Sequence, residues 1–172
     1  MKYICAICVV LLLFVYSTAP ANLIAHWKLD ETTGTTVADE TGNNDGDLSA
    51  AAGATAFAAG HVNGALDVSP GAAKIPCGNA SNGSFTGTAM TVMAWINPKA
   101  ATTGAIIGHM NEGMSPAQGW FFFHNTGGLQ PVGHMVLGAT VNGGWGDTGS
   151  SDSLIPAGQW SHVACTYDGT NC

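Results

Sequence analysis

The chain has 172 residues, of which 46% are hydrophobic and only 9% are charged. Four Lys and Arg residues stand against eleven Asp and Glu residues, so the formal net charge is −7 at pH 7. Proteins that bind nucleic acid neutralise phosphates with clustered Lys and Arg, and this composition therefore excludes that class and disfavours other polyanionic partners. Neutral ligands and cations fit the charge better.

The first 21 residues have the pattern of a secretory signal peptide. Lys2 precedes an apolar stretch over residues 4–16, and Ala19 and Ala21 occupy the −3 and −1 positions of a small-residue cleavage site. The apolar stretch is shorter than the ~20 residues that a membrane-spanning helix needs. We expect cleavage after Ala21 and an exported chain over residues 22–172 with no membrane span. A retained N-terminal anchor is the alternative.

Beyond residue 21, short apolar or alternating segments are separated by stretches rich in Gly, Ser, Thr and Asn. This pattern is typical of all-β proteins. The most helix-like stretch, residues 50–60, is interrupted by Gly53 and Thr55. The pattern predicts a two-sheet antiparallel sandwich or jelly roll. The expected strands cover residues 23–29, 64–69, 72–77, 89–98, 105–110, 120–125, 133–141 and 160–168.

Four segments carry a resemblance to a known family. They are "LIAHWKLDETTGTTVADETGNNDGDL", "AGHVNGALDVS", "MTVMAWINP" and "IPAGQWSHVACTYDGTN". In this order and spacing they resemble the LamG-like jelly-roll domains of the concanavalin A-like lectin/glucanase superfamily, over essentially all of residues 22–172. The resemblance implies a secreted, non-catalytic binding or adhesion module whose partner is a polysaccharide or glycoconjugate. A structural or protein-interaction module of a larger surface protein or secreted enzyme, with an extracellular protein as partner and no sugar site, stays open.

In the family, the "TYDG" turn leads into further strands that close the sandwich. This chain ends at Cys172, shortly after that turn. We therefore expect a domain that is incomplete at its C-terminus, with closing strands missing and an open sheet edge.

Residues 29–48 form an acidic segment that is a candidate calcium-binding loop. Placing Gly46 at the glycine position of an EF-hand loop puts Thr41 and Ala52 where that loop needs acids, so an EF-hand is excluded. Some superfamily members bind calcium through acidic loops at the rim of the sandwich, and the resemblance makes Ca²⁺ an expected cofactor here. The candidate ligands are Asp30, Asp39, Asn43 and Asp45. The alternative is a set of Asp- and Asn-rich turns without an ion.

No catalytic residue is predicted. The superfamily's glucanases carry an acid triplet on one strand, and the only Glu residues here, Glu31, Glu40 and Glu112, do not have its spacing. Acids that are adjacent in sequence, such as Asp39 and Glu40, would point to opposite faces of a strand and could not act as a pair.

The tryptophans divide into two groups. Trp27, Trp95 and Trp160 lie within strand patterns, and we expect them in the core. Trp145 lies in a segment of Gly, Asp and Ser where we expect no strand, and with Asn142 and Asp147 it forms the predicted sugar contact, with Trp120 as a further candidate. The alternative is that the loop of Trp145 folds back over the end of the sandwich.

Cys5 and Cys8 belong to the signal peptide, which leaves Cys77, Cys165 and Cys172 in an oxidising compartment. A two-residue turn at Asp168 and Gly169 would place Cys165 opposite Cys172, so a cross-strand disulfide between them is expected. Pairing of Cys77 with either of them, or with a cysteine outside this chain, stays open.

Overall fold

The computed structural model describes residues 22–51, 55–68, 74–78, 89–99, 104–111, 118–125, 134–141, 144–150 and 155–168. These residues form ten strands and no helix, and every strand pairing is antiparallel. The predicted all-β fold is confirmed. No helix in the described part of the chain is long and apolar enough to cross a membrane. The expected signal peptide lies outside the described residues.

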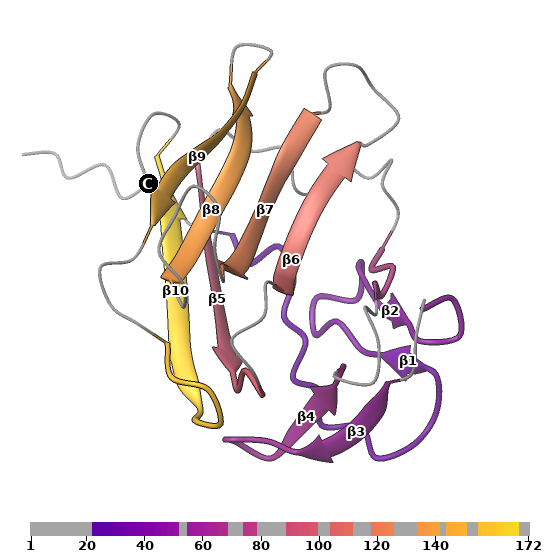
Figure 1. Ribbon diagram of the computed structural model, residues 1–172. Helices are drawn as coiled ribbons and strands as arrows, with labels where there is room; N and C mark the ends of the chain where they lie inside the picture. Colours follow the sequence, from indigo (N-terminus) through magenta and orange to yellow (C-terminus); the bar gives the residue numbers. More distant parts are fainter. Residues whose placement is uncertain are drawn as a thin grey trace, which may run out of the picture.

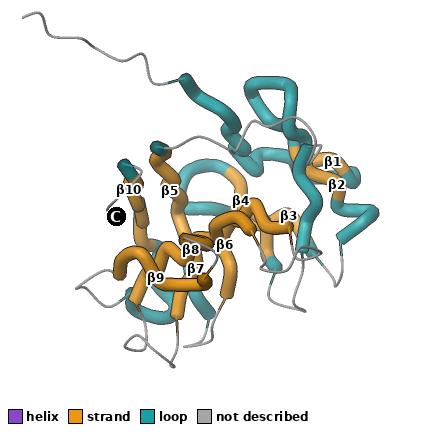
Figure 2. Tube along the Cα trace, turned by 90° about the horizontal axis from the view of Figure 1, so that it is seen from above, coloured by secondary structure: helices purple, strands orange, loops and turns teal. Residues whose placement is uncertain are grey.

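Two antiparallel sheets form the sandwich (Figure 1 and Figure 2). The larger sheet has the strand order β6-β7-β8-β9, and the smaller one pairs β10 with β5. The four strands of the larger sheet are β6 (Gly104–Asn111), β7 (Gln118–Asn125), β8 (His134–Val141) and β9 (Gly144–Ser150). The smaller sheet contains β5 (Met90–Ile96) and β10 (Ser161–Tyr167).

The core lies between the two sheets. Trp120 and Phe122 of β7 and Val163 of β10 are buried, and partly buried apolar side chains from β5, β6 and β10 pack against them. Burial alternates residue by residue along β5 and along β10, as expected for strands that have one face in a core and one face outside. Val92, Ala94 and Ile96 face inward on β5.

The described residues 22–51, 55–68 and 74–78 form a second region beside the sandwich, with two small hairpins (Figure 1). β1 (Thr36–Val37) pairs with β2 (Gly46–Asp47), and β3 (Ala56–Ala59) pairs with β4 (Gly64–Asp67). Gly64 begins β4 where that strand crosses the chain at Leu29, and a Cβ at Gly64 would lie 2.2 Å from the carbonyl oxygen of Leu29. Only glycine fits such a close backbone approach.

Three segments differ from the expected strands. Residues 23–29 form a single bridge, between Trp27 and Asp39, because the segment is held mainly by side-chain hydrogen bonds from the acidic loop. Residues 56–59, inside the most helix-like stretch, form β3. Residues 144–150, expected as a loop, form β9, because a strand ladder is made by backbone groups and a Gly-rich segment can supply them to β8. Of the expected strand at 72–77, the described part shows an isolated bridge at Cys77.

Candidate functional site

The acidic loop is organised around the carboxylate of Asp39, which is 4% exposed. Its Oδ1 accepts hydrogen bonds from the backbone amides of His26 (2.7 Å) and Thr41 (3.1 Å). Its Oδ2 accepts from the Thr41 hydroxyl and from both the backbone amide and the side-chain Nδ2 of Asn44 (3.1 and 3.2 Å). A buried carboxylate that accepts this many donors holds its loop in one conformation.

The same contacts set the protonation state of Asp39. Burial alone would raise the pKa of its carboxyl, but the hydrogen bonds from Thr41, His26 and Asn44 favour the ionised form and hold the pKa well below its ordinary value. Asp39 is therefore charged at any physiological pH, and the hydrogen-bond donors around it stabilise its negative charge.

Of the four predicted calcium ligands, Asp39, Asn43 and Asp45 lie together in the acidic loop, where Asp39 Oδ2 also accepts from the Asn43 amide (3.4 Å). Asp45 Oδ1 accepts from the Asp39 amide (2.8 Å), and the Asn43 side chain donates to the Thr41 carbonyl (3.0 Å). Asp30 lies at a different place, where it accepts from Gly64 N (3.0 Å). Among the residues that the structure describes, no group of three or more His, Cys, Asp or Glu side chains lies close enough to hold a metal ion. Asp30 thus connects the N-terminal segment to the β3–β4 hairpin, and calcium binding stays a prediction.

One open hollow lies between residues 30–32 and the β3–β4 hairpin. A second hollow, which shares Asp30 and Glu31 with the first, is lined also by Lys28, Ala38 and Glu40. Two of its acids already have partners: Glu31 Oε1 accepts from Ala38 N (2.8 Å), and Glu40 pairs with Lys28 (2.9 Å). These contacts tie the two sides of the N-terminal segment together.

The structure corrects the prediction that Trp120 contacts a sugar and the prediction that Trp145 lies in a loop. Trp120 is 8% exposed and belongs to the core between the sheets, so its ring is not available to a ligand. Trp145 lies in strand β9, opposite Thr140, and not in a loop. Asn142, the third predicted contact, lies outside the described residues.

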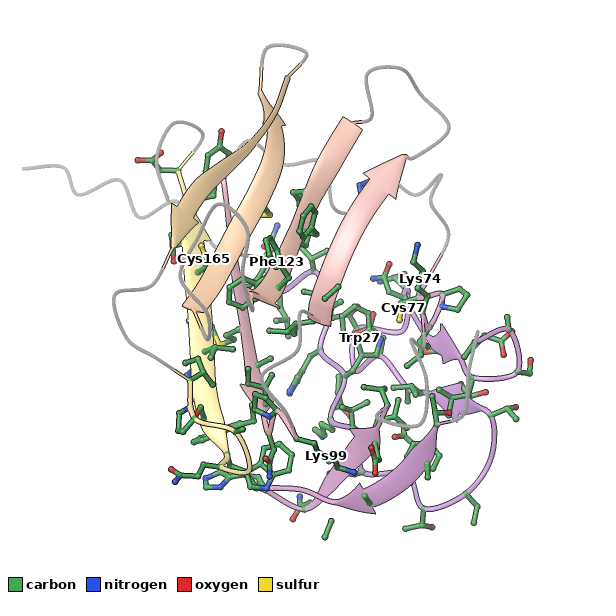
Figure 3. All side chains as sticks on the ribbon, viewed as in Figure 1. Trp27, Lys74, Cys77, Lys99, Phe123 and Cys165 are labelled. Carbon is green, nitrogen blue, oxygen red and sulfur yellow. The ribbon has the colours of Figure 1, made fainter. Side chains whose placement is uncertain are left out.

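Asp147 also lies on β9, where it pairs with Gly138 of β8. On β7, the rings of Phe121 and Phe123, with centroids 4.5 Å apart, flank the buried Phe122 in sequence (Figure 3 labels Phe123). Contact of Trp145 and Asp147 with a ligand stays a prediction.

A second aromatic cluster, which the sequence analysis did not anticipate, lies at one end of the smaller sheet. Trp95 is 44% exposed instead of buried, and its indole stacks on the imidazole of His61 with ring centroids 3.8 Å apart and planes at 30°. His162, directly opposite Trp95 on β10, meets the indole edge-on at 5.2 Å. Trp160 lies 6.4 Å from His61. We call His61, Trp95, Trp160 and His162 the aromatic cluster.

Three separate segments build the aromatic cluster. His61 comes from the turn of the β3–β4 hairpin, whose tip lies beside the end of β5 and the start of β10 (Figure 1). The sequence contained a signal for the exposure of Trp95, because Val92, Ala94 and Ile96 supply the inward face of β5 and leave Thr91, Met93 and Trp95 outside. No local signal connects His61, 34 positions earlier, with this strand.

The two cysteines that the structure describes, Cys77 and Cys165, lie in different parts of the fold. Cys165 lies on β10, opposite Val92, and Cys77 lies beside β2, across a bridge from Gly46 (Figure 3). Burial, and to a lesser degree the charge of Asp39, raises the pKa of the Cys77 thiol to about 11. Cys172 lies outside the described residues, so its disulfide with Cys165 stays a prediction.

Comparisons with curated proteins and with solved structures found no match. Residues 71–172 match the family model Laminin_G_3, whose description is the concanavalin A-like lectin/glucanases superfamily. The matched region contains all six strands of the sandwich and extends over more than half of the chain. The chain therefore belongs to the concanavalin A-like lectin/glucanase superfamily, as its LamG-like sequence motifs predict.

Proposed function

We propose that residues 22–172 form a non-catalytic binding module of a secreted protein, and that its ligand is a neutral carbohydrate bound at the aromatic cluster. The observation that carries the proposal is the exposed indole of Trp95, held by ring contacts with His61 and His162. A superfamily that includes lectins supports a binding role.

The physical argument begins with the ring. The apolar C–H face of a pyranose packs on an exposed aromatic ring, and polar groups around the ring fix the orientation of the sugar hydroxyls. His61 and His162 supply ring nitrogens beside Trp95, and both residues are exposed. Their contacts with the indole hold it in one orientation before a ligand arrives, which lowers the entropic cost of binding.

The charge of the chain favours a neutral ligand. With four Lys and Arg residues against eleven acids, a sulfated or uronic acid polymer would meet net repulsion. A neutral polysaccharide such as a glucan, mannan or xylan would not.

The acids of the described region support a non-catalytic role. A glycosidase needs one carboxyl group with a raised pKa to act as a general acid, beside a second carboxylate. The pKa of Asp39 is lowered, and its neighbour Glu40 pairs with Lys28. Both carboxylates stabilise the N-terminal region.

The test is affinity electrophoresis of residues 22–172 through gels that contain neutral polysaccharides. We expect retardation by at least one polymer, loss of that retardation in Trp95→Ala, and normal retardation of Val68→Ala, a control that removes a similarly exposed side chain outside β5 and β10. A parallel gel with chelator tests whether calcium contributes. A folded protein that no polymer retards would contradict the proposal and favour the protein-interaction module.

A further inference from the structure

The aromatic cluster occupies only one end of an exposed sheet face. Three cross-strand pairs lie on the outer face of the smaller sheet, and all six residues are exposed. Met93 is 61% exposed, and neither it nor its partner Ala164 carries a polar group. In order along the strands, the pairs are Trp95 with His162, Met93 with Ala164, and Thr91 with Thr166.

The far end of this face is polar. The hydroxyls of Thr91 and Thr166 lie 3.1 Å apart and share one hydrogen bond. Two hydroxyls hold two donors and four lone pairs, so after their mutual bond one donor and three lone pairs stay free for a ligand. Thr91 and Trp95 are four residues apart on β5, which corresponds to about 13–14 Å along the strand. A single sugar ring on Trp95 does not reach the threonine pair.

We infer that the ligand is a linear neutral oligosaccharide or polysaccharide that lies along the outer face of β5 and β10. One sugar unit packs on Trp95, the next units cross Met93 and Ala164, and a further unit hydrogen-bonds to the hydroxyls of Thr91 and Thr166. The inference rests on the proposed function and names the ligand as an extended chain, as opposed to a terminal or single sugar.

The chemistry of the face favours this occupant over a second copy of the protein. The face has an aromatic end, an apolar middle and a hydroxyl-bearing end, and its six residues include no Lys, Asp or Glu. A neutral chain with C–H faces and hydroxyl edges complements all three parts. A second copy would bring its own net charge of −7 against an identical charge.

The test is isothermal titration calorimetry with cello-, manno- and xylo-oligosaccharides of one, two, four and six units. We expect one series to bind, with the affinity rising at least tenfold between the single sugar and the hexasaccharide. The double substitution Thr91→Val and Thr166→Val should weaken hexasaccharide binding about tenfold, because it removes one or two hydrogen bonds. The same double substitution should leave binding of the short sugars unchanged. Thr36→Val, on the exposed side of β1, is the matched control and should change nothing.

A second variant guards against a folding defect in the first. Ala164→Glu places a charged side chain in the middle of the face and should block the hexasaccharide while a single sugar still binds at Trp95. Each variant is compared by cooperative thermal melting.

The outcomes separate the inference from the proposed function. Equal affinity for one and six units, or an unchanged hexasaccharide affinity in the threonine double variant, overturns the inference and leaves sugar binding at Trp95 in place. A wild-type protein that binds none of the sugars overturns both. A concentration-dependent dimer that Met93→Asp dissociates, together with no sugar binding, would assign the face to self-association.

Discussion

Asp39 and Asn44 form the buried centre of the N-terminal loop, where one carboxylate oxygen of Asp39 accepts from both the backbone and the side-chain nitrogen of Asn44, at 3.1 and 3.2 Å. Asn44 is fully buried, and its side-chain nitrogen also donates to the carbonyl of Ile24 (3.1 Å), so the pair connects the loop to the start of the described chain. The Asn44 carbonyl in turn accepts from the indole nitrogen of Trp27 at 2.7 Å. The N-terminal region thus depends on one ionised acceptor.

Replacing Asp39 by Asn should therefore destabilise the protein strongly. An amide offers one acceptor oxygen where the carboxylate offers two, and its NH₂ group would face N–H donors of the loop. We expect a loss of about 3 kcal/mol or more in the free energy of unfolding, measured by urea denaturation at pH 7. Asp47→Asn is the matched control, since the side chain of exposed Asp47 accepts hydrogen bonds from its near neighbours Ser49 and Ala50, and its effect should be much smaller. Equal effects of the two substitutions would contradict the central role of Asp39.

The stability should also fall in acid. The folded-state pKa of Asp39 is lowered below its ordinary value of 3.8. The stabilisation is therefore fully present above about pH 4 and is lost as the pH falls through that value toward the folded-state pKa. Urea denaturation of wild type and Asp39→Asn between pH 7 and pH 2.5 should show their difference shrinking below pH 4. A difference that stays constant to pH 2.5 would show that the charge of Asp39 does not contribute.

Truncation of Phe122, which is 1% exposed and lies between the sheets, should destabilise the protein. Phe122→Ala removes a ring that packs against β5 and β10, and a cost of about 3–5 kcal/mol is expected in the free energy of unfolding. Met93→Ala, on the outer face of the smaller sheet, should cost less than about 1 kcal/mol. Thermal or urea melting compares the two. A small effect at Phe122 would mean that the two sheets do not pack through β7.

The alternation of side chains made much of the sandwich predictable. Thr91, Met93 and Trp95 alternate with inward apolar residues on β5, and the same holds on β10, so these strands were expected at nearly their observed positions. β9 was missed because its Gly-rich sequence has no apolar alternation and its pairing with β8 is made by the backbone. Residues 23–29 had alternation, yet side-chain hydrogen bonds around Asp39 hold them in place of a ladder.

The candidate site was harder to predict for a different reason. The residue types pointed to aromatic rings and acids as candidate ligand contacts, and Asp39 was named as a calcium ligand, a role that stays a prediction. Which ring is exposed depends on which face of its strand meets the other sheet. Trp120 lies on the face of β7 that packs in the core, whereas Trp95 lies on the exposed face of β5. The approach of His61 to Trp95 depends on the placement of the β3–β4 hairpin, which no local pattern contains.

The Cys77 thiol should react slowly in the folded protein. With a pKa of about 11, its thiolate fraction at pH 8 is roughly 10⁻³, and thiolate is the reactive form. We expect alkylation by iodoacetamide at pH 8 to be about two orders of magnitude slower for the folded chain than for the urea-unfolded chain. Peptide mass spectrometry follows Cys77 separately from Cys165 and Cys172. Fast labelling of folded Cys77 would contradict the raised pKa and show that its thiol ionises readily.

The stack of His61 on Trp95 should contribute measurable coupling between the hairpin and the sandwich. A double-mutant cycle with His61→Ala and Trp95→Ala is expected to give a coupling energy of about 0.5–1.5 kcal/mol in urea denaturation, the range for aromatic pairs. A parallel cycle with His61→Ala and Met93→Ala should give a value near zero and serves as the control. If the first cycle also gives zero, His61 does not hold the indole, and the orientation of Trp95 must come from His162 alone. A clear coupling energy would mean that His61→Ala also weakens ligand binding, by less than Trp95→Ala does, because it frees the ring without removing it.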